Sequence, residues 1–389
     1  MRTAKRILSV PPYLFARIEK TRDGLKARGI NIIDLGVGDP DMPTFPRIVK
    51  EMHKAIDDPK NHNYPPYEGT PQFRAAVSSW YKRRFGVSID PDKEVLSLIG
   101  SKEGIAHVFL AFIDPGDIAL IPDPAYPVYK IGTIFAGGIP HIVPLLEKNK
   151  FLPDLSGIDP KVAKKAKLLF INYPNNPTGA VADRKALEEA VSFARDNDLL
   201  LCSDLAYSEV SFDGYRPMSV LEIQGAKDCC IEFHSLSKTY NMTGWRIGMA
   251  VGSPKAIAAL SVIKTNIDSG AFKAIQEAAV EALNGDPKET EDNNLKYQRR
   301  RDVFIDGLNG LGWSLEKIKS TFYVWGRVPK AHTSESFCAE VLEKAAVLLV
   351  PGSGYGEHGE GYFRASITTP EERLSEAVDR MKKAGMRFK

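Results

Sequence analysis

Cysteine is scarce in this chain of 389 residues, and its spacing excludes two common structural devices. Only four cysteines are present, two of them adjacent as Cys229 and Cys230, and no C-x-x-C pair occurs. Disulfide frameworks and cysteine-based zinc sites both need several cysteines at characteristic spacing. The histidines likewise lack a second ligand at metal spacing. We therefore expect free thiols in a reducing compartment, and no metal site.

Long apolar runs and an excess of one charge are also missing. No stretch approaches transmembrane length, and the segment that begins Met1-Arg2-Thr3 lacks the apolar core of a signal peptide. The 52 basic and 49 acidic residues leave a net charge of +3, which provides no field favouring nucleic acid or an anionic membrane. We interpret the basic runs at residues 82–84 and 299–301 as solvated helix faces, and expect a cytoplasmic protein.

The glycine pattern of nicotinamide-binding proteins is absent too. The segments 36–38 and 352–356 contain closely spaced glycines, but neither fits G-x-G-x-x-G. That pattern needs each glycine, for the tight turn, for the approach of the pyrophosphate and for helix packing. A nicotinamide cofactor is therefore not expected.

The chain does contain a regular alternation of strand-length apolar runs with helical patterns such as residues 184–197. The predicted strands cover residues 95–99, 118–122, 168–172, 199–203, 230–235 and 247–251. Such alternation predicts a mostly parallel sheet covered by helices on both faces. After a helical pattern at 287–311, a smaller α+β module is predicted, with strands at 313–316, 322–326, 347–350 and 361–367 and helices at 334–345 and 371–385.

Polar residues follow four of the predicted strands, where ligands bind in open α/β folds. The four ends carry, in chain order, Ser101 at a helix start, Asn176 in a turn, Asp204 with Tyr207, and the group Ser235, Ser237, Lys238 and Arg246. An amine beside an anion cradle is what a pyridoxal 5'-phosphate (PLP) enzyme needs, because the amine holds the aldehyde and the cradle holds the phosphate. Taken singly, Lys238 and Arg246 could be surface charges and Asp204 a helix cap.

Together these motifs resemble the class I and II aminotransferases of PLP fold type I. The matching patterns are N-N-P-T-G at 175–179, S-D-x-A-Y at 203–207 and S-x-S-K at 235–238, and the resemblance extends from about residue 34 to about residue 366. The resemblance implies an α/β fold whose large domain, residues 47–290, has a mostly parallel, seven-stranded type of sheet covered by helices. Residues 291–389 would form the small α+β domain, against which residues 1–46 would pack.

The resemblance also implies a role for each matching residue around the cofactor ring. Lys238 would form the Schiff base and move protons, Asp204 would pair with the pyridinium nitrogen, and Asn176 and Tyr207 would hydrogen-bond the phenolic oxygen. Tyr126 would stack on the ring, although a core tyrosine is the alternative. The catalytic set is therefore Lys238, Asp204 and Tyr207.

For the phosphate, the resemblance implies backbone and side-chain donors: Ser101, Lys102, Ser235, Ser237 and Arg246. Tyr64 matches a tyrosine that reaches the phosphate of a neighbouring subunit, and Ser269 is a further candidate to cross over. A homodimer with active sites shared across its interface follows from this match.

On the substrate side, Arg364 matches the arginine that takes the α-carboxylate, and Gly38 would let the backbone approach it. Lys102, Tyr126 and Asn176 would contribute to the same pocket, and Tyr13, Lys102 and Glu68 are candidates for contacting the far end of the substrate. Glu68 could equally be a solvated loop residue.

Within the family the chain looks most like the LL-diaminopimelate aminotransferases, through segments such as 11–15, 99–105, 172–180 and 239–245. The implied reaction is ping-pong transfer between LL-diaminopimelate and 2-oxoglutarate, on the route to lysine. Aspartate or alanine transamination and a PLP-dependent lyase are the alternatives, because none of these motifs fixes the side-chain pocket. A PLP-sensing regulator is the non-enzymatic alternative, but no pattern here predicts the DNA-binding domain that such a regulator normally carries.

Overall fold

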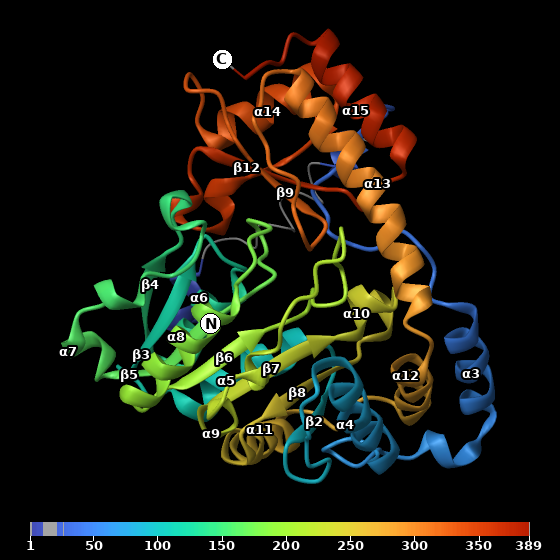
Figure 1. Ribbon diagram of the computed structural model, residues 1–389, viewed down its shortest axis with the longest axis vertical. Coiled ribbons are helices and arrows are strands. Elements are labelled where there is room, and N and C mark those ends of the chain that lie inside the picture. The colour runs from blue at the N-terminus through green and yellow to red at the C-terminus, as the bar shows by residue number, and fades with distance from the viewer. Residues whose placement is uncertain (1, 11–21, 26, 389) are drawn as a thin grey trace.

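The computed structural model describes residues 2–10, 22–25 and 27–388. Its main feature is a seven-stranded sheet that lies in the lower half of Figure 1. In spatial order the strands are β2 (Val95–Leu98), β8 (Gly248–Gly252), β7 (Cys230–Ser235), β6 (Leu200–Asp204), β5 (Ala166–Ile171), β3 (Ile118–Asp123) and β4 (Ile139–Pro144). Only β8 runs in the direction opposite to the other six strands. The predicted mostly parallel α/β sheet is therefore confirmed.

Both faces of this sheet are buried, as the run of apolar residues in β5 illustrates. Leu168 and Phe170 belong to one apolar core, and Leu169 and Ile171 belong to the other. Successive side chains of a strand point to opposite faces, so a strand covered on both sides needs apolar residues at every position. Helices α5 and α11 contribute to the first core, and α4, α8 and α12 to the second.

The described helices surround this sheet and a second body above it (Figure 1). The α-helices are α1 (Lys5–Leu8), α3 (Pro46–Asp57), α4 (Pro71–Phe85), α5 (Ser101–Phe112), α6 (Val128–Phe135), α7 (Pro160–Ala163), α8 (Arg184–Asp196), α9 (Ala226–Cys229), α10 (Leu236–Thr239), α11 (Pro254–Ile267), α12 (Lys273–Asn284), α13 (Lys288–Gly310), α14 (Ser334–Ala345) and α15 (Glu371–Lys383). In the described part of the chain, no helix is both long enough and apolar enough to cross a membrane.

The second body contains two small sheets packed against α13, α14 and α15 (Figure 1). Strands β11 (Val350–Pro351), β12 (Tyr362–Ser366) and β9 (Tyr323–Arg327) form an antiparallel sheet in that order. The other sheet pairs β1 (Ile33–Asp34) with β10 (Val347–Leu348) in parallel. An early segment of the chain is thus hydrogen-bonded to a late one, although the division at residues 46 and 290 remains our proposal.

Helix α13 runs between the two bodies (Figure 1). Two of its arginines make ion pairs that the sequence did not predict. Arg300 forms a bidentate pair with Asp41 at 2.7 and 2.8 Å. Arg301 is 1% exposed and donates to Asp213 at 2.6 Å and to the main-chain oxygen of Ile318 at 2.8 Å. The interpretation of residues 299–301 as a solvated helix face is therefore wrong for Arg300 and Arg301, because the guanidinium group of each is paired with residues distant in sequence.

Two further differences concern strands. Residues 313–316 form no strand, because the Asn309 side chain hydrogen-bonds both the N–H and the C=O of Leu315 at 2.8 and 3.0 Å, in place of a neighbouring strand. Conversely, β4 was not predicted from the sequence. It includes Pro140 and Pro144, which weaken the strand pattern, but proline is tolerated in β4 because this strand lies at an edge of the sheet.

Candidate active site

Along one edge of the large sheet (Figure 1), the strands end near the polar residues that the sequence singled out. Strands β3 to β7 are parallel, so their carboxyl ends share this edge. Strand β2 points the same way as β7, because each is antiparallel to β8. The amino end of β8 lies there too, which explains how Arg246, two residues before Gly248, joins residues that follow other strands.

A cavity of about 360 Å³ opens at this edge. Its walls bring together most of the residues that the sequence singled out: Gly38, Ser101, Lys102, Tyr126, Asn176, Asp204, Tyr207, Ser235, Ser237, Lys238 and Arg246. Val37, Asp39, Asn172, Thr243 and Tyr323 also line it. The size suits a small organic ligand.

One corner of the cavity, which we call the anion corner, has the hydrogen-bond donors that an anion requires. Helix α5 begins at Ser101, and the N–H groups of a first helical turn have no partners within the helix. Gly100 has φ of 76°, and a Cβ on it would lie 2.2 Å from Nη2 of Arg246. Glycine is therefore required for the guanidinium to approach this turn. Arg246 itself adopts a left-handed φ of 57°, a conformation that few non-glycine residues take.

The hydroxyl of Ser237 gives a direct reason to expect a ligand at this corner. Ser237 is 3% exposed, and its Oγ has no hydrogen-bond partner among the described residues. Ser235 caps α10 by accepting from the N–H of Ser237 at 3.2 Å. A buried hydroxyl without a partner is costly, and a phosphate oxygen would satisfy it. The corner thus fits the phosphate of PLP.

Asp204 is the buried acid of the site. It is the last residue of β6 and 6% exposed, and its Oδ2 accepts a hydrogen bond of 2.7 Å from the hydroxyl of Tyr129. Burial raises the pKa of Asp204 to about 6, opposed by the Tyr129 hydrogen bond, the N–H of Ala206 and the charge of His234. No helix follows Asp204 directly, so the helix-cap alternative is wrong.

Lys238 is the candidate nucleophile. Its ammonium donates to the main-chain oxygen of Gly38 at 2.8 Å. Burial lowers the pKa of Lys238 to about 8; Asp39 raises it, and Arg364 and Arg246 lower it further. A lysine whose pKa is lowered in this way has a much larger neutral fraction near neutral pH than an exposed lysine.

The pH dependence of amine labelling should report this pKa. Only the neutral amine attacks an acylating reagent, so in ligand-free protein the labelling rate of Lys238 should rise about tenfold per pH unit below pH 8 and level off above it. Acetic anhydride and mass spectrometry of the Lys238 peptide would measure the rate. A lysine model peptide, with a pKa of about 10.4, is the control; a Lys238 profile that keeps rising with the peptide contradicts the depressed value.

Two contacts organise the side of the cavity facing the small sheets. The hydroxyl of Tyr207 lies 3.1 Å from that of Tyr323 on β9. Arg364 on β12 is fully buried and donates through Nη1 to Oδ1 of Asn176 at 3.0 Å and through Nη2 to the main-chain oxygen of Gly36. Its guanidinium carbon lies 4.1 Å from the centre of the Tyr323 ring. The structure thus joins Arg364 to the site through Asn176 and Tyr323.

Gly38 lies where the backbone passes closest to these side chains. A Cβ at this position would be 2.0 Å from the hydroxyl oxygen of Tyr323. The sequence predicted a close backbone approach at Gly38. The structure shows that Tyr323 leaves no room for a side chain, while the main-chain oxygen of Gly38 accepts from Lys238.

Four predicted residues that the structure describes do not line the cavity: Arg364, Tyr64, Ser269 and Glu68. Tyr64 is 83% exposed, and Ser269 and Glu68 are also exposed; their proposed roles stay predictions. Tyr13 lies outside the described residues. The loops of Tyr64 and Ser269 lie against each other, since a Cβ on Gly270 would be 3.1 Å from Cγ of Pro65. Both residues therefore belong to one exposed region.

Sequence reasoning missed three residues of the site: Tyr129, Tyr323 and Asp39. Tyr129 follows Tyr126 by three positions, a spacing that would have placed both on one side of a helix. Tyr323 lies in a predicted strand, where an aromatic residue is ordinarily part of the core. Asp39 is one residue beyond Gly38, and only the fold reveals that its charge acts on Lys238.

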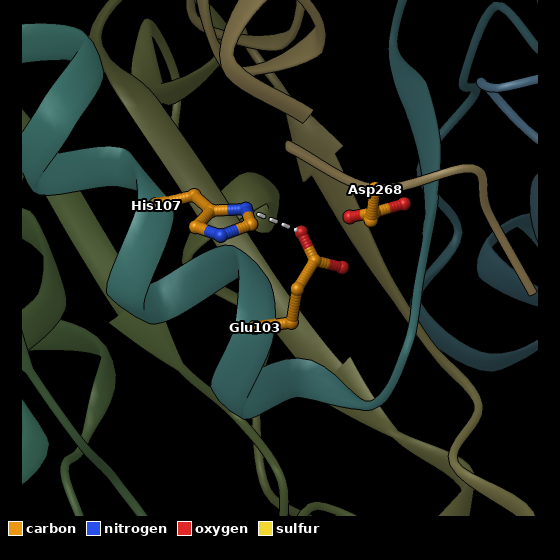
Figure 2. Close-up of side chains that lie close together, drawn as sticks. All are labelled: Glu103, His107 and Asp268. Atoms are coloured by element: carbon orange, nitrogen blue, oxygen red, sulfur yellow. Dashed lines mark ion pairs between the residues drawn. The ribbon is translucent and has the colours of Figure 1, made fainter. Parts of the chain in front are cut away.

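A cluster of possible metal ligands lies beneath the anion corner. Glu103 and His107 on α5 face Asp268, as Figure 2 shows. The buried ammonium of Lys264 lies 3.1 Å from Oε2 of Glu103 and 2.8 Å from Oδ1 of Asp268. This lysine already supplies the positive charge that the two carboxylates require, so we assign no metal ion to the cluster.

Comparison with known proteins agrees with this arrangement. Residues 30–381 match the model of the family described as aminotransferase class I and II. LL-diaminopimelate aminotransferase of Gloeobacter violaceus is 54% identical and LL-diaminopimelate aminotransferase 2 of Trichormus variabilis 56% identical, each over 100% of both chains. The substrate-bound structure of BacF from Bacillus subtilis is 40% identical, with a TM-score of 0.96 over 100% of this chain and 99% of that one. This chain therefore belongs to the class I and II aminotransferases.

Proposed function

We propose that this aminotransferase uses PLP to move an amino group from LL-diaminopimelate to 2-oxoglutarate by a ping-pong cycle, on the route to lysine. Enzymes of this family depend on PLP in general. The observation that carries the proposal is the cavity in which Lys238, Asp204 and the anion corner converge. The choice of donor is supported by relatives with that name, which match the whole chain at 54 and 56% identity.

When bound, PLP supplies an electron sink for the negative charge that develops at the substrate Cα. Asp204 would face the ring nitrogen, where its negative charge would keep the nitrogen protonated. Lys238 is the amine for the aldehyde and afterwards the base and acid that moves the Cα proton, a task suited to a pKa of about 8. Tyr207 and Asn176 would hydrogen-bond the phenolic oxygen, and Tyr126 would pack on the ring.

The phosphate would be held apart from the reacting atoms. Ser101 and Lys102 offer backbone N–H groups at the start of α5, Ser235 and Ser237 offer hydroxyls, and Arg246 offers a guanidinium. The unpartnered Oγ of Ser237 supports this assignment. A phosphate held by these donors would set the position of the ring relative to Lys238 and Asp204.

On the substrate side, Arg364 is the proposed partner of the α-carboxylate, with Asn176 and Gly38 beside it. The guanidinium is held by Asn176 and by the main-chain oxygen of Gly36, so its orientation is set before a carboxylate arrives. Lys102, Glu68 and Tyr13 remain candidates for the far end of the substrate.

A homodimer with shared active sites is part of the proposal. Tyr64 and Ser269 lie in neighbouring exposed loops, as expected of side chains that reach the phosphate corner of a second copy. The enzyme would work in the cytoplasm, where its amino-acid and oxo-acid substrates are found.

A panel of single amino donors tests the proposal. The purified PLP form is mixed with LL-diaminopimelate, aspartate or alanine, and conversion to the pyridoxamine form is followed by absorbance. The value of kcat/KM for LL-diaminopimelate should exceed the other two by about two orders of magnitude, because a small donor leaves polar groups for the far end unpaired. DD-diaminopimelate, with the same charges and size, is the control.

Other outcomes identify the alternatives. Comparable values for the three donors would refute LL-diaminopimelate as the specific substrate and leave a general aminotransferase. Release of pyruvate and ammonia would indicate a lyase. No spectral conversion with any amino acid would refute amino-group transfer.

A further inference from the structure

Tyr129 is a buried residue to which neither the sequence motifs nor the proposed chemistry gives a role. It lies on α6, is 0% exposed and does not line the cavity. Its hydroxyl nevertheless donates a 2.7 Å hydrogen bond to Oδ2 of Asp204. Tyr129 thus contacts the acid of the site from outside the cavity.

The ring of Tyr129 is held in one orientation from several sides. It stacks on Phe170 with centroids 4.9 Å apart and an interplanar angle of 26°, and Phe170 stacks in turn on Phe109 at 4.9 Å. Tyr126, which lines the cavity, meets Tyr129 edge to face at 6.1 Å. Thr133 donates to the main-chain oxygen of Tyr129 at 2.9 Å. The direction of the hydroxyl is therefore fixed by packing.

The hydrogen bond can run in only one sense. Burial and the neighbouring charge of Asp204 raise the pKa of Tyr129 well above its ordinary value, so the phenol keeps its proton. The other side-chain contact of Asp204 among the described residues is a longer one, 3.3 Å from the N–H of Ala206 to Oδ1. Tyr129 is therefore the main donor to this carboxylate.

We infer that Tyr129 is a positioning residue for amino-group transfer, acting through Asp204. Its hydroxyl fixes the rotation of the carboxylate, so that one oxygen is held in the core and the other is directed to the cavity. By withdrawing charge from that carboxylate it also makes Asp204 a weaker base, so that a proton shared with the ring nitrogen stays on the nitrogen. The inference rests on the proposed function, because it requires Asp204 to face a pyridine nitrogen.

The variant Tyr129→Phe tests this role, with Tyr81→Phe as a matched control. Tyr81 is also 0% exposed and donates to a buried carboxylate, Oε1 of Glu232, at 3.0 Å, but this pair does not contact Asp204. Both variants lose one phenol hydrogen bond to a buried acid, so both should lose stability. Only an effect specific to Tyr129 bears on the inference.

The direct readout is the ¹⁵N chemical shift of PLP labelled at the ring nitrogen and bound to each protein. Tyr129→Phe should move the shift toward that of an unprotonated pyridine, and should lower kcat of the donor half-reaction roughly 10- to 100-fold, the size of a lost hydrogen bond to a charged group. The KM for the donor should change little. Tyr81→Phe should match wild type in all three.

A double-variant cycle shows whether the effect passes through Asp204. In an Asp204→Asn background, Tyr129→Phe should cause no further fall in kcat. If Tyr129→Phe behaves like Tyr81→Phe, or if its effect adds fully to that of Asp204→Asn, the inference is wrong. A wild-type protein that binds no PLP would instead refute the proposed function.

A second substitution covers the case in which Tyr129→Phe does not fold. Difluorotyrosine at position 129 is close in size to tyrosine and a stronger acid, so its ionisation can be followed by ultraviolet absorbance. Its phenol should ionise at a lower pH in Asp204→Asn protein than beside Asp204, because the opposing charge is gone. Equal ionisation in the two backgrounds overturns the inference.

Discussion

Lys238→Ala should reduce amino-group transfer by about five orders of magnitude or more while leaving a folded protein that still binds PLP. The large loss is expected because, in the proposed mechanism, the same amine holds the aldehyde and moves the Cα proton, and alanine can do neither. Folding should survive, since the substitution removes a half-buried amine whose protonated form is disfavoured by burial. PLP should still bind, because the donors of the phosphate corner are other residues.

Borohydride reduction identifies the amine that carries the cofactor. In wild-type protein it should fix a pyridoxyl group on the peptide containing Lys238, and in Lys238→Ala no lysine should be labelled. Lys102 is an internal control, since it lines the same cavity but has no proposed covalent role. A reduced adduct on Lys102 would contradict the assignment, as would near-normal turnover of Lys238→Ala.

Asp204→Asn should lower the rate of the donor half-reaction at least about 1000-fold, with a much smaller effect on substrate binding. Asparagine has nearly the same shape but carries no charge, so it could not fulfil the proposed role of keeping the ring nitrogen protonated as negative charge develops at the Cα. Loss of an interaction that acts mainly in the transition state lowers kcat. Stopped-flow absorbance in a single turnover separates this rate from product release.

Asp123→Asn provides a matched control for this variant. Asp123 ends β3, at the same edge of the sheet, and is 4% exposed, but its Oδ1 accepts the N–H of His358 at 2.8 Å and it does not line the cavity. Asp123→Asn should cost stability and leave the half-reaction within a few-fold of wild type. Equal rates in the two variants would mean that Asp204 has only a structural role.

The sequence predicts which residues meet in the cavity where those residues lie at or after strand ends. Asp204 ends a strand, and Ser101, Asn176 and Lys238 come after strands. Parallel strands bring their carboxyl ends to one edge of the sheet whatever the details of packing. Arg246 required the family pattern, because only the reversed direction of β8 brings it to that edge.

Tertiary contacts account for what the sequence could not predict. Tyr129 is defined by its hydrogen bond to Asp204, which is distant in sequence. Arg301 has the local pattern of a solvated residue, and only the approach of Asp213 and Ile318 explains its burial. The predicted strand at 313–316 failed because the side chain of Asn309 takes the hydrogen bonds of Leu315.

The pairing of β1 with β10 has a consequence for synthesis of the chain. All strands of the large sheet lie between residues 95 and 252, so that sheet can form while the ribosome is still translating the rest. Ile33 can pair with Val347 only after Val347 has been translated, and Arg364 is translated later still. A nascent chain can thus assemble Lys238, Asp204 and the anion corner before Arg364, the proposed partner of the α-carboxylate, has been translated. The protein should become able to bind substrate only at the end of translation, after it has become able to bind the cofactor.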